Sequence, residues 1–130
     1  MCGICGVVSY REPPDLSVVE AMVGALAHRG PDGCGWMRDH KAVLGHARLA
    51  LLDPDGGAQP LGNTDGTLWL TFNGEIYNYL ELRDELRRLG HRFVTGTDTE
   101  VIVHAFDEWG EDCFERLNGQ FALAIWDRRR

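Results

Sequence analysis

The sequence predicts a single α+β domain, and three observations lead to this class. Apolar residues recur with a helical period in three stretches, at about residues 16–28, 79–89 and 97–109. Around them lie short runs rich in β-branched and aromatic residues, bounded by glycine, proline and asparagine, as strands usually are. The length of 130 residues and the hydrophobic content of 44% suit one globular domain with its own core.

The first half of the chain is expected to hold one helix and three strands. The strands are expected at residues 3–10, 35–38 and 42–52. The helix is expected at about residues 16–28, where Ser17 and Glu20 have the spacing of a capping box. The glycine-rich segment HRGPDGCG follows the helix and ends it.

The middle of the chain carries a hairpin signal. Residues 67–72 alternate and favour a strand, and Asn73-Gly74 is the dipeptide that type I′ turns prefer. We therefore expect the chain to turn at Asn73-Gly74 and to return through residues 75–77. This local interpretation needs no function for either residue.

The second half is expected to alternate helices and strands. A helix beginning near Tyr79 should end at Gly90, and a short strand should occupy residues 92–95. Thr97 and Glu100 have capping-box spacing and should open a second helix. The apolar run at residues 119–127 predicts a strand buried on both faces. Such a strand needs two neighbours, so we expect a domain that breaks off before its sheets are complete.

Charge and composition exclude several classes of function. A net charge of -7 disfavours nucleic acid and anionic membranes as partners. No apolar run reaches the length of a membrane span and no signal peptide is evident, so we expect a cytoplasmic protein. The four cysteines are scattered, and although Cys2 and Cys5 have zinc-ligand spacing, no second pair completes a tetrahedral site. No metal site is therefore expected.

Cys2 is the residue whose position indicates catalysis. If Met1 is removed, the thiol and the free α-amine lie on one residue, which pairs a nucleophile with a base of pKa about 7.7 to 8.0. A retained Met1 would convert this amine into a non-basic amide. A cysteine at position 2 is weak evidence alone, because a single motif needs its context.

Six motifs supply that context, in the order CGICGVV, HRGPDGCGW, GHARLALLD, FNGEIYNYLELRDEL, GTDTEVI and NGQFALAIWD. Together they resemble the N-terminal glutaminase domain of asparagine synthetase, a class II glutamine amidotransferase, over nearly the whole chain. The resemblance implies one amidotransferase domain over residues 1–130, although incomplete at its C-terminus. It also implies the fold of N-terminal-nucleophile hydrolases, in which two antiparallel sheets stack face to face between helices (αββα).

The resemblance assigns catalytic roles to three residues. It implies that Cys2 attacks the side-chain amide of glutamine, releases ammonia and forms a γ-glutamyl thioester that water hydrolyses. The side-chain amide of Asn73 and the backbone N–H of Gly74 would stabilise the tetrahedral oxyanion. The residue types fit these roles, because glycine lets the main chain approach a substrate closely.

The resemblance also assigns substrate-binding roles. Arg48 would pair with the α-carboxylate of glutamine, Asp98 with Glu75 would bind the α-ammonium, and backbone groups of Leu51 and Leu52 would hold the substrate. Simpler alternatives remain for each. Arg48 could be a surface residue, Asp98 a helix cap, and the two leucine side chains part of the core.

The expected partners follow from the same resemblance. They are glutamine and a C-terminal synthetase domain that would amidate aspartate; a homodimer is left open, and nucleic acid and membranes are not expected. No cofactor is expected for this domain, since ATP and Mg²⁺ would belong to the synthetase domain, whose SGGxDS loop does not occur here. Two alternatives stay open: an amidotransferase with another acceptor, and an inactive glutamine-binding fragment.

Overall fold

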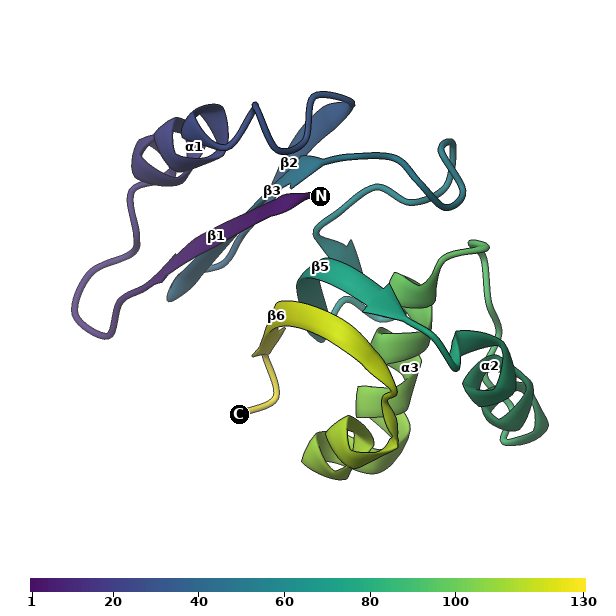
Figure 1. The fold of residues 1–130 in the computed structure, drawn as a ribbon. Helices are drawn as coiled ribbons and strands as arrows, with labels where there is room; N and C mark the ends of the chain where they lie inside the picture. Colours follow the sequence, from purple (N-terminus) through teal and green to yellow (C-terminus); the bar gives the residue numbers. More distant parts are fainter.

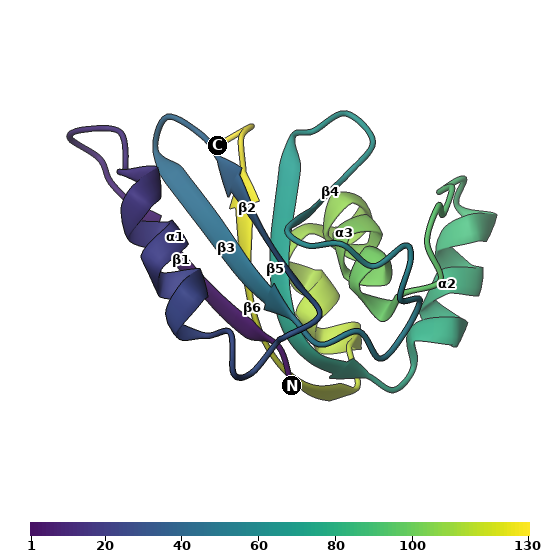
Figure 2. The ribbon, with the colours of Figure 1, turned by 90° about the horizontal axis from the view of Figure 1, so that it is seen from above.

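The computed structural model describes all residues, 1–130, and contains two three-stranded antiparallel sheets. In the first sheet β3 (Ala42–Arg48) lies between β1 (Gly3–Val8) and β2 (Gly33–Arg38). In the second sheet β5 (Leu68–Ile76) lies between the short β4 (Leu61–Gly62) and β6 (Gly119–Asp127). The two sheets face each other, as Figures 1 and 2 show.

Helices cover the outer faces of both sheets. Helix α1 (Leu16–Ala25) packs on the first sheet, and α2 (Tyr79–Arg88) and α3 (Asp98–Trp109) lie outside the second, followed by a 3₁₀ segment, Gly110–Arg116. The order of layers is helix, sheet, sheet, helix, which is clearest from above (Figure 2). This confirms the α+β class and the stacked αββα arrangement that the sequence predicts. None of the helices combines the length and apolar character that crossing a membrane requires.

The two sheets are joined through a buried polar contact. The hydroxyl of Thr71 in β5 donates to the backbone oxygen of Gly45 in β3, at 3.1 Å. Because its only hydrogen is used there, the hydroxyl accepts from Nδ1–H of His46, at 3.0 Å. His46 is fully buried, and burial, with a smaller contribution from the Arg48 charge, lowers its pKa to about 4. His46 is thus a packed, neutral histidine that joins the two sheets.

The helix termini are set by the capping residues that the sequence offers. Thr97 caps α3 by accepting from the backbone N–H of Glu100, as predicted. The predicted cap of α1 is wrong: Asp15, not Ser17, is the N-cap, because its carboxylate accepts from the Ser17 N–H at 2.9 Å. Helix α1 also ends at Ala25, three residues before the predicted end at His28.

Several predicted strand features are also corrected. Residues 92–95 form no strand, because the backbone N–H groups of Val94 and Thr95 bind the Glu100 carboxylate instead of a neighbouring strand. Strand β3 ends at Arg48 and does not reach residue 52. The final strand has the predicted bounds but is not buried on both faces: none of its residues is buried, and Phe121 is 38% exposed. It also forms an edge of its sheet.

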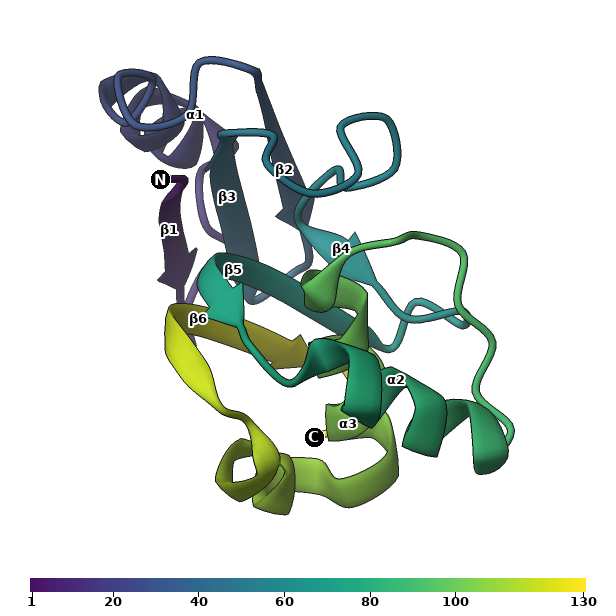
Figure 3. The same ribbon diagram turned by 45° about the vertical axis from the view of Figure 1, so that its right-hand side comes forward.

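The predicted hairpin at Asn73-Gly74 is the most consequential error. Both residues lie inside the continuous strand β5, where Asn73 pairs with Ala122 and Gly74 with Phe121 of β6. The local dipeptide favours a turn, but the long apolar strand β6 offers a partner along the whole length of β5. Asn73 and Gly74 therefore lie near the C-terminal end of β5, which Figure 3 shows beside β6.

Candidate active site

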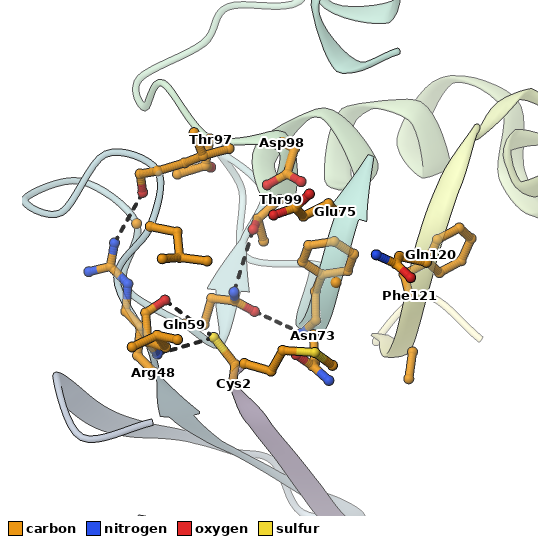
Figure 4. A pocket seen from close by; sticks show the side chains of 18 residues that line it. Cys2, Arg48, Gln59, Asn73, Glu75, Thr97, Asp98, Thr99, Gln120 and Phe121 are labelled. Atoms are coloured by element: carbon orange, nitrogen blue, oxygen red, sulfur yellow. Dashed lines mark hydrogen bonds between the residues drawn. The ribbon is translucent and has the colours of Figure 1, made fainter. Parts of the chain in front are cut away.

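One cavity of about 330 Å³ lies where the two sheets meet the start of α3. Its volume falls in the range of small-molecule sites, about 300 to 1,000 Å³. All eight residues that the resemblance implicates line it, together with several others drawn in Figure 4: Cys2, Arg48, Leu51, Leu52, Asn73, Gly74, Glu75 and Asp98. The structure thus brings together residues from positions 2 to 98 of the chain.

Cys2 is held at the cavity although it lies at the N-terminus. Strand β1 begins at the next residue and pairs with β3 from Gly3 onward, and the Arg29 side chain donates to the Cys2 carbonyl at 3.1 Å. The Leu49 backbone N–H donates to the Cys2 sulfur at 3.2 Å, which fixes the direction of the thiol. These contacts pin a terminus that would otherwise be mobile. Met1 also lines the cavity.

The guanidinium of Arg48 points into the loop that covers one side of the cavity. It donates to the backbone oxygens of Pro54 at 2.8 Å and Asp53 at 2.7 Å. Arg48 is therefore not a free surface residue, and it presents a fixed positive charge to the cavity. Figure 4 shows it on the opposite side from Glu75 and Asp98.

The acidic side of the cavity is formed by two adjacent carboxylates. Asp98, the first residue of α3, accepts from the Ile76 backbone N–H at 2.9 Å and is only 5% exposed. Burial raises the pKa of Asp98, and the neighbouring charge of Glu75 raises it further. Asp98 does not cap the helix, since Thr97 does so; a ligand cation at this point would relieve the repulsion between the two carboxylates.

The free edge of β5 presents a row of backbone N–H groups to the cavity. Alternate N–H groups of a strand point to the same edge, and those of Phe72, Gly74 and Ile76 point away from β6. The Gln59 side chain accepts from Phe72 at 2.8 Å, and Asp98 accepts from Ile76 at 2.9 Å. Gly74 lies between them, and no side chain accepts its N–H. One unpaired donor is therefore left at the cavity.

Asn73 and Gly74 have the properties that an oxyanion site requires. The Asn73 carboxamide makes no hydrogen bond to the protein, so its N–H groups are available to a ligand. Gly74 has φ of +151°, and a Cβ at this position would collide with the backbone oxygen of Gln120 and lie 2.6 Å from Phe121 Cα. Only glycine fits here, because both the backbone conformation and the space exclude a side chain.

The two leucines of the loop that covers the cavity are not part of the hydrophobic core, which was the simpler alternative for them. Leu51 and Leu52 both line the cavity, but they are 66% and 41% exposed and do not belong to the core. Their place on a loop, not in an extended β3, explains this exposure. Their predicted backbone contact with substrate is compatible with the geometry and stays a prediction.

Sequence reasoning missed several residues that line the cavity. They are Gln59, Thr97, Thr99, Gln120 and Phe121 as side chains, with Gly57 at the rim. Gln59 lies on an irregular segment between the sheets, where no periodic pattern marks a side chain as inward-facing. Gln120 and Phe121 lie within the predicted strand of residues 119–127, but strand identity alone does not show what faces its neighbour.

The other cysteines have different surroundings. Burial raises the pKa of Cys5, and it raises that of Cys113 to about 11, with the Asp112 charge adding to the shift. Cys34 is exposed on β2 and does not line the cavity. Among the four thiols, Cys2 is the one that lines the cavity. No group of three or more metal-binding side chains is present.

The comparisons with known proteins agree with this geometry. Residues 1–130 match the family described as "Glutamine amidotransferase domain". The chain is 42% identical to asparagine synthetase [glutamine-hydrolyzing] 3 of Bacillus subtilis over its whole length, and 42% identical to asparagine synthetase [glutamine-hydrolyzing] 1 of Arabidopsis thaliana over 99% of it. It spans 22% of the length of each of these relatives.

The fold also matches a solved structure. Glutamine phosphoribosylpyrophosphate amidotransferase from B. subtilis, complexed with ADP and GMP, superposes with a TM-score of 0.74 over 98% of this chain and 35% of that one. The sequence identity is 23%, so this similarity concerns the fold. It agrees with the predicted architecture of N-terminal-nucleophile amidotransferases.

Proposed function

The chain belongs to the family of glutamine amidotransferase domains, and from this premise we propose that its cavity binds glutamine and hydrolyses it to glutamate and ammonia. The observation that carries the proposal is the single cavity that joins Cys2 to Asn73, Gly74, Arg48 and the acidic pair. Nucleophile, oxyanion donors and charges of both signs are the groups that this substrate and reaction need.

Substrate recognition uses the two charged sides of the cavity. Arg48 binds the α-carboxylate, with its guanidinium already oriented by the Pro54 and Asp53 carbonyls. Asp98 and Glu75 bind the α-ammonium, whose positive charge offsets the repulsion that raises the Asp98 pKa. Backbone groups of Leu51 and Leu52 complete the site. The side-chain amide of glutamine is then directed toward the remaining wall, where Cys2 and Asn73 lie.

The chemistry begins once Met1 has been removed. The free α-amine of Cys2 takes the thiol proton, and the sulfur attacks the amide carbon to form a tetrahedral oxyanion. Gly74 N–H and the Asn73 carboxamide donate to that oxygen, a contribution of about 10² to 10³ in rate per donor. The C–N bond breaks, the leaving nitrogen takes the proton from the amine, and ammonia departs. Water hydrolyses the thioester, which releases glutamate and restores the thiol.

Ammonia release measured beside intact mass tests this proposal. A chain that lacks Met1 should release ammonia from glutamine, and Cys2→Ala should abolish the release while leaving the thermal midpoint unchanged. A chain that retains Met1 should be inactive, because its α-amine lies one residue further from the sulfur. Glutamine binding without turnover in a processed, folded chain would contradict the proposal and favour the binding fragment.

We also propose that the ammonia serves the amidation of aspartate to asparagine in a C-terminal synthetase domain, where ATP and Mg²⁺ would act. The relatives of 42% identity support this acceptor, since each is an asparagine synthetase of the glutamine-hydrolysing kind. Joined to such a synthetase domain, the chain should support glutamine-dependent formation of asparagine. A domain that amidates another acceptor would contradict it. A homodimer stays a prediction, which light scattering of the purified chain can test.

A further inference from the structure

Gln59 lines the cavity, and neither its sequence context nor the proposed mechanism gives it a role. Its side-chain oxygen accepts from the Phe72 backbone N–H at 2.8 Å. Its side-chain nitrogen lies 3.4 Å from the hydroxyl of Thr99, in the first turn of α3. Figure 4 shows this amide between Thr99 and the segment that carries Asn73. Gln59 therefore links the strand with the oxyanion donors to the helix with the ammonium site.

The point at which Gln59 binds β5 indicates what its side chain does. Strand β4 pairs with β5 only through Leu61 and Gly62, opposite Leu70 and Trp69. Beyond that point no strand pairs with this edge, so Gln59 supplies the acceptor for Phe72 and Asp98 supplies the acceptor for Ile76. The stretch between these two supports contains the proposed oxyanion donors, and the Gly74 N–H lies two residues from each supported N–H.

We propose that Gln59 is a positioning residue that holds Asn73 and Gly74 in place for oxyanion stabilisation, an inference that rests on the proposed glutaminase function. Gln59 acts through the main chain: it fixes the Phe72 N–H, and this sets the peptide unit that follows. The Gly74 conformation makes the support necessary, because a glycine at φ of +151° has no side chain to restrict its own backbone. A displacement of about 1 Å at the reacting atoms is enough to lower a rate about 10²-fold.

The first test replaces Gln59 with methionine, which keeps the length of the side chain and removes the acceptor. Gln59→Met should lower kcat for glutamine hydrolysis by about 10- to 100-fold, the range expected for displaced oxyanion donors. KM should stay within about threefold, since Arg48 and Asp98 are untouched. Alkylation of Cys2 by iodoacetamide, which forms no oxyanion, should proceed at the rate of the unsubstituted chain.

Asn63 offers a matched control on the same edge of β5. Its side-chain oxygen accepts from the Leu68 backbone N–H at 3.0 Å, so Asn63→Leu removes the same kind of support far from the cavity. This variant should lose stability but keep kcat. Unchanged kcat in Gln59→Met would overturn the inference, as would an equal loss in both variants or a parallel loss of Cys2 alkylation.

Hydrogen exchange separates this inference from the proposed function. In Gln59→Met the Phe72 amide, which loses its acceptor, should exchange faster, while the Ile76 amide, bound to Asp98, should not change. If the unsubstituted, processed chain releases no ammonia, the proposed function fails, but the exchange rates of these two amides still test whether Gln59 holds the strand. An unchanged exchange rate at Phe72, or an equal increase at both amides, would overturn the inference.

A second substitution covers the case in which Gln59→Met does not fold. Gln59→Glu keeps an oxygen facing Phe72 but cannot donate to Thr99. Its Phe72 amide should stay protected and its kcat should stay within about tenfold of the unsubstituted chain. Loss of protection at Phe72 in this variant would overturn the inference.

Discussion

The two sheet layers differ in how firmly each is packed. The layer of β4, β5 and β6 with α2 and α3 encloses a core cluster of 12 buried residues, whereas the layer of β1, β2 and β3 with α1 encloses a cluster of four. We call the layer with four buried residues the thin layer and the layer with 12 the thick layer. The proposed nucleophile, Cys2, belongs to the thin layer, and the proposed oxyanion donors and the acidic pair belong to the thick layer. The cavity thus lies between a layer with a large core and a layer with a small one. Contacts between the two layers must keep the reacting groups at fixed positions relative to one another.

This difference suggests that the two layers have different functions, one holding groups in a fixed geometry and the other leaving the nucleophile accessible. In the proposed mechanism Asn73, Gly74 and Asp98 need a fixed geometry, because they would act as preorganised donors and charges. Cys2 must be approached by substrate, and its chain end must be open to removal of Met1, so a lightly packed layer suits it.

The strongest effect is expected at Gly74 in the thick layer. Gly74→Ala should lower glutamine turnover at least about 10²-fold, because the new Cβ collides with the Gln120 carbonyl and displaces an oxyanion donor. The measurement is kcat by ammonia release. Gly66→Ala is the control: Gly66 also has a positive φ, but its Cβ would meet nothing within 4 Å. Equal losses of turnover in the two variants would argue against a role for Gly74 at the cavity.

The contact between the layers should make stability depend on pH. His46 is neutral when folded, with its pKa lowered to about 4 by burial, and its unfolded pKa is about 6.5. The unfolded chain therefore binds the proton first as the pH falls, so this contribution to stability is complete above about pH 6.5 and is lost toward pH 4. The loss amounts to about 3 kcal/mol.

Urea unfolding at several pH values measures this effect. Other carboxylates also lose stability in acid, so the informative quantity is the difference from His46→Gln, which cannot titrate. The slope between pH 6.5 and 4 should be shallower in the variant. Parallel curves for the two proteins would show that His46 is not held neutral between the sheets.

A matched pair of core valines compares the two layers directly. Val101 lies in the 12-residue cluster and Val19 in the four-residue cluster, and both are completely buried. Each change to alanine removes about two methylene equivalents, at about 0.8 kcal/mol each, plus a cavity cost that depends on how far the site can relax. We expect Val101→Ala to cost about 1 kcal/mol more than Val19→Ala in free energy of unfolding. The reverse order would contradict the comparison.

The smallest effect is expected at the loop that covers the cavity. The Asp53 carboxylate accepts from the Gly96 N–H at 2.8 Å and from the Gly56 N–H at 3.0 Å, and its backbone oxygen binds Arg48. Asp53→Asn should raise KM for glutamine about threefold, the effect of weakening one charge-assisted hydrogen bond, with kcat unchanged. Asp55→Asn in the same loop is the control, and an equal rise in KM there would exclude a specific role for Asp53.

The sequence predicts best those elements whose pattern is long and local. Helix α3 and strand β6 have the expected bounds, because their apolar periods extend over nine or more residues and glycine or threonine marks their ends. The hairpin at Asn73-Gly74 is wrong for the opposite reason. A two-residue preference is weak, and a partner strand more than forty residues away decides the conformation.

The site could be predicted only in part, for a similar reason. The motifs indicate eight residues as candidates for substrate contact or catalysis, and all eight line the cavity. Gln59 and Gln120 have no such signal, since whether they line the cavity depends on what lies opposite them in the folded chain. A residue that accepts from one N–H of a distant strand leaves no pattern in its own neighbourhood.

The most direct test of the account uses an electrophilic glutamine analogue, 6-diazo-5-oxo-L-norleucine, on the chain without Met1. Loss of N₂ should leave one covalent adduct on Cys2, found by peptide mapping, and excess glutamine should slow its formation. Cys34, the exposed thiol outside the cavity, serves as an internal reference and should stay unmodified. Modification of Cys34 at the same rate as Cys2, or labelling that glutamine does not slow, would contradict the claim that this cavity is a glutamine site.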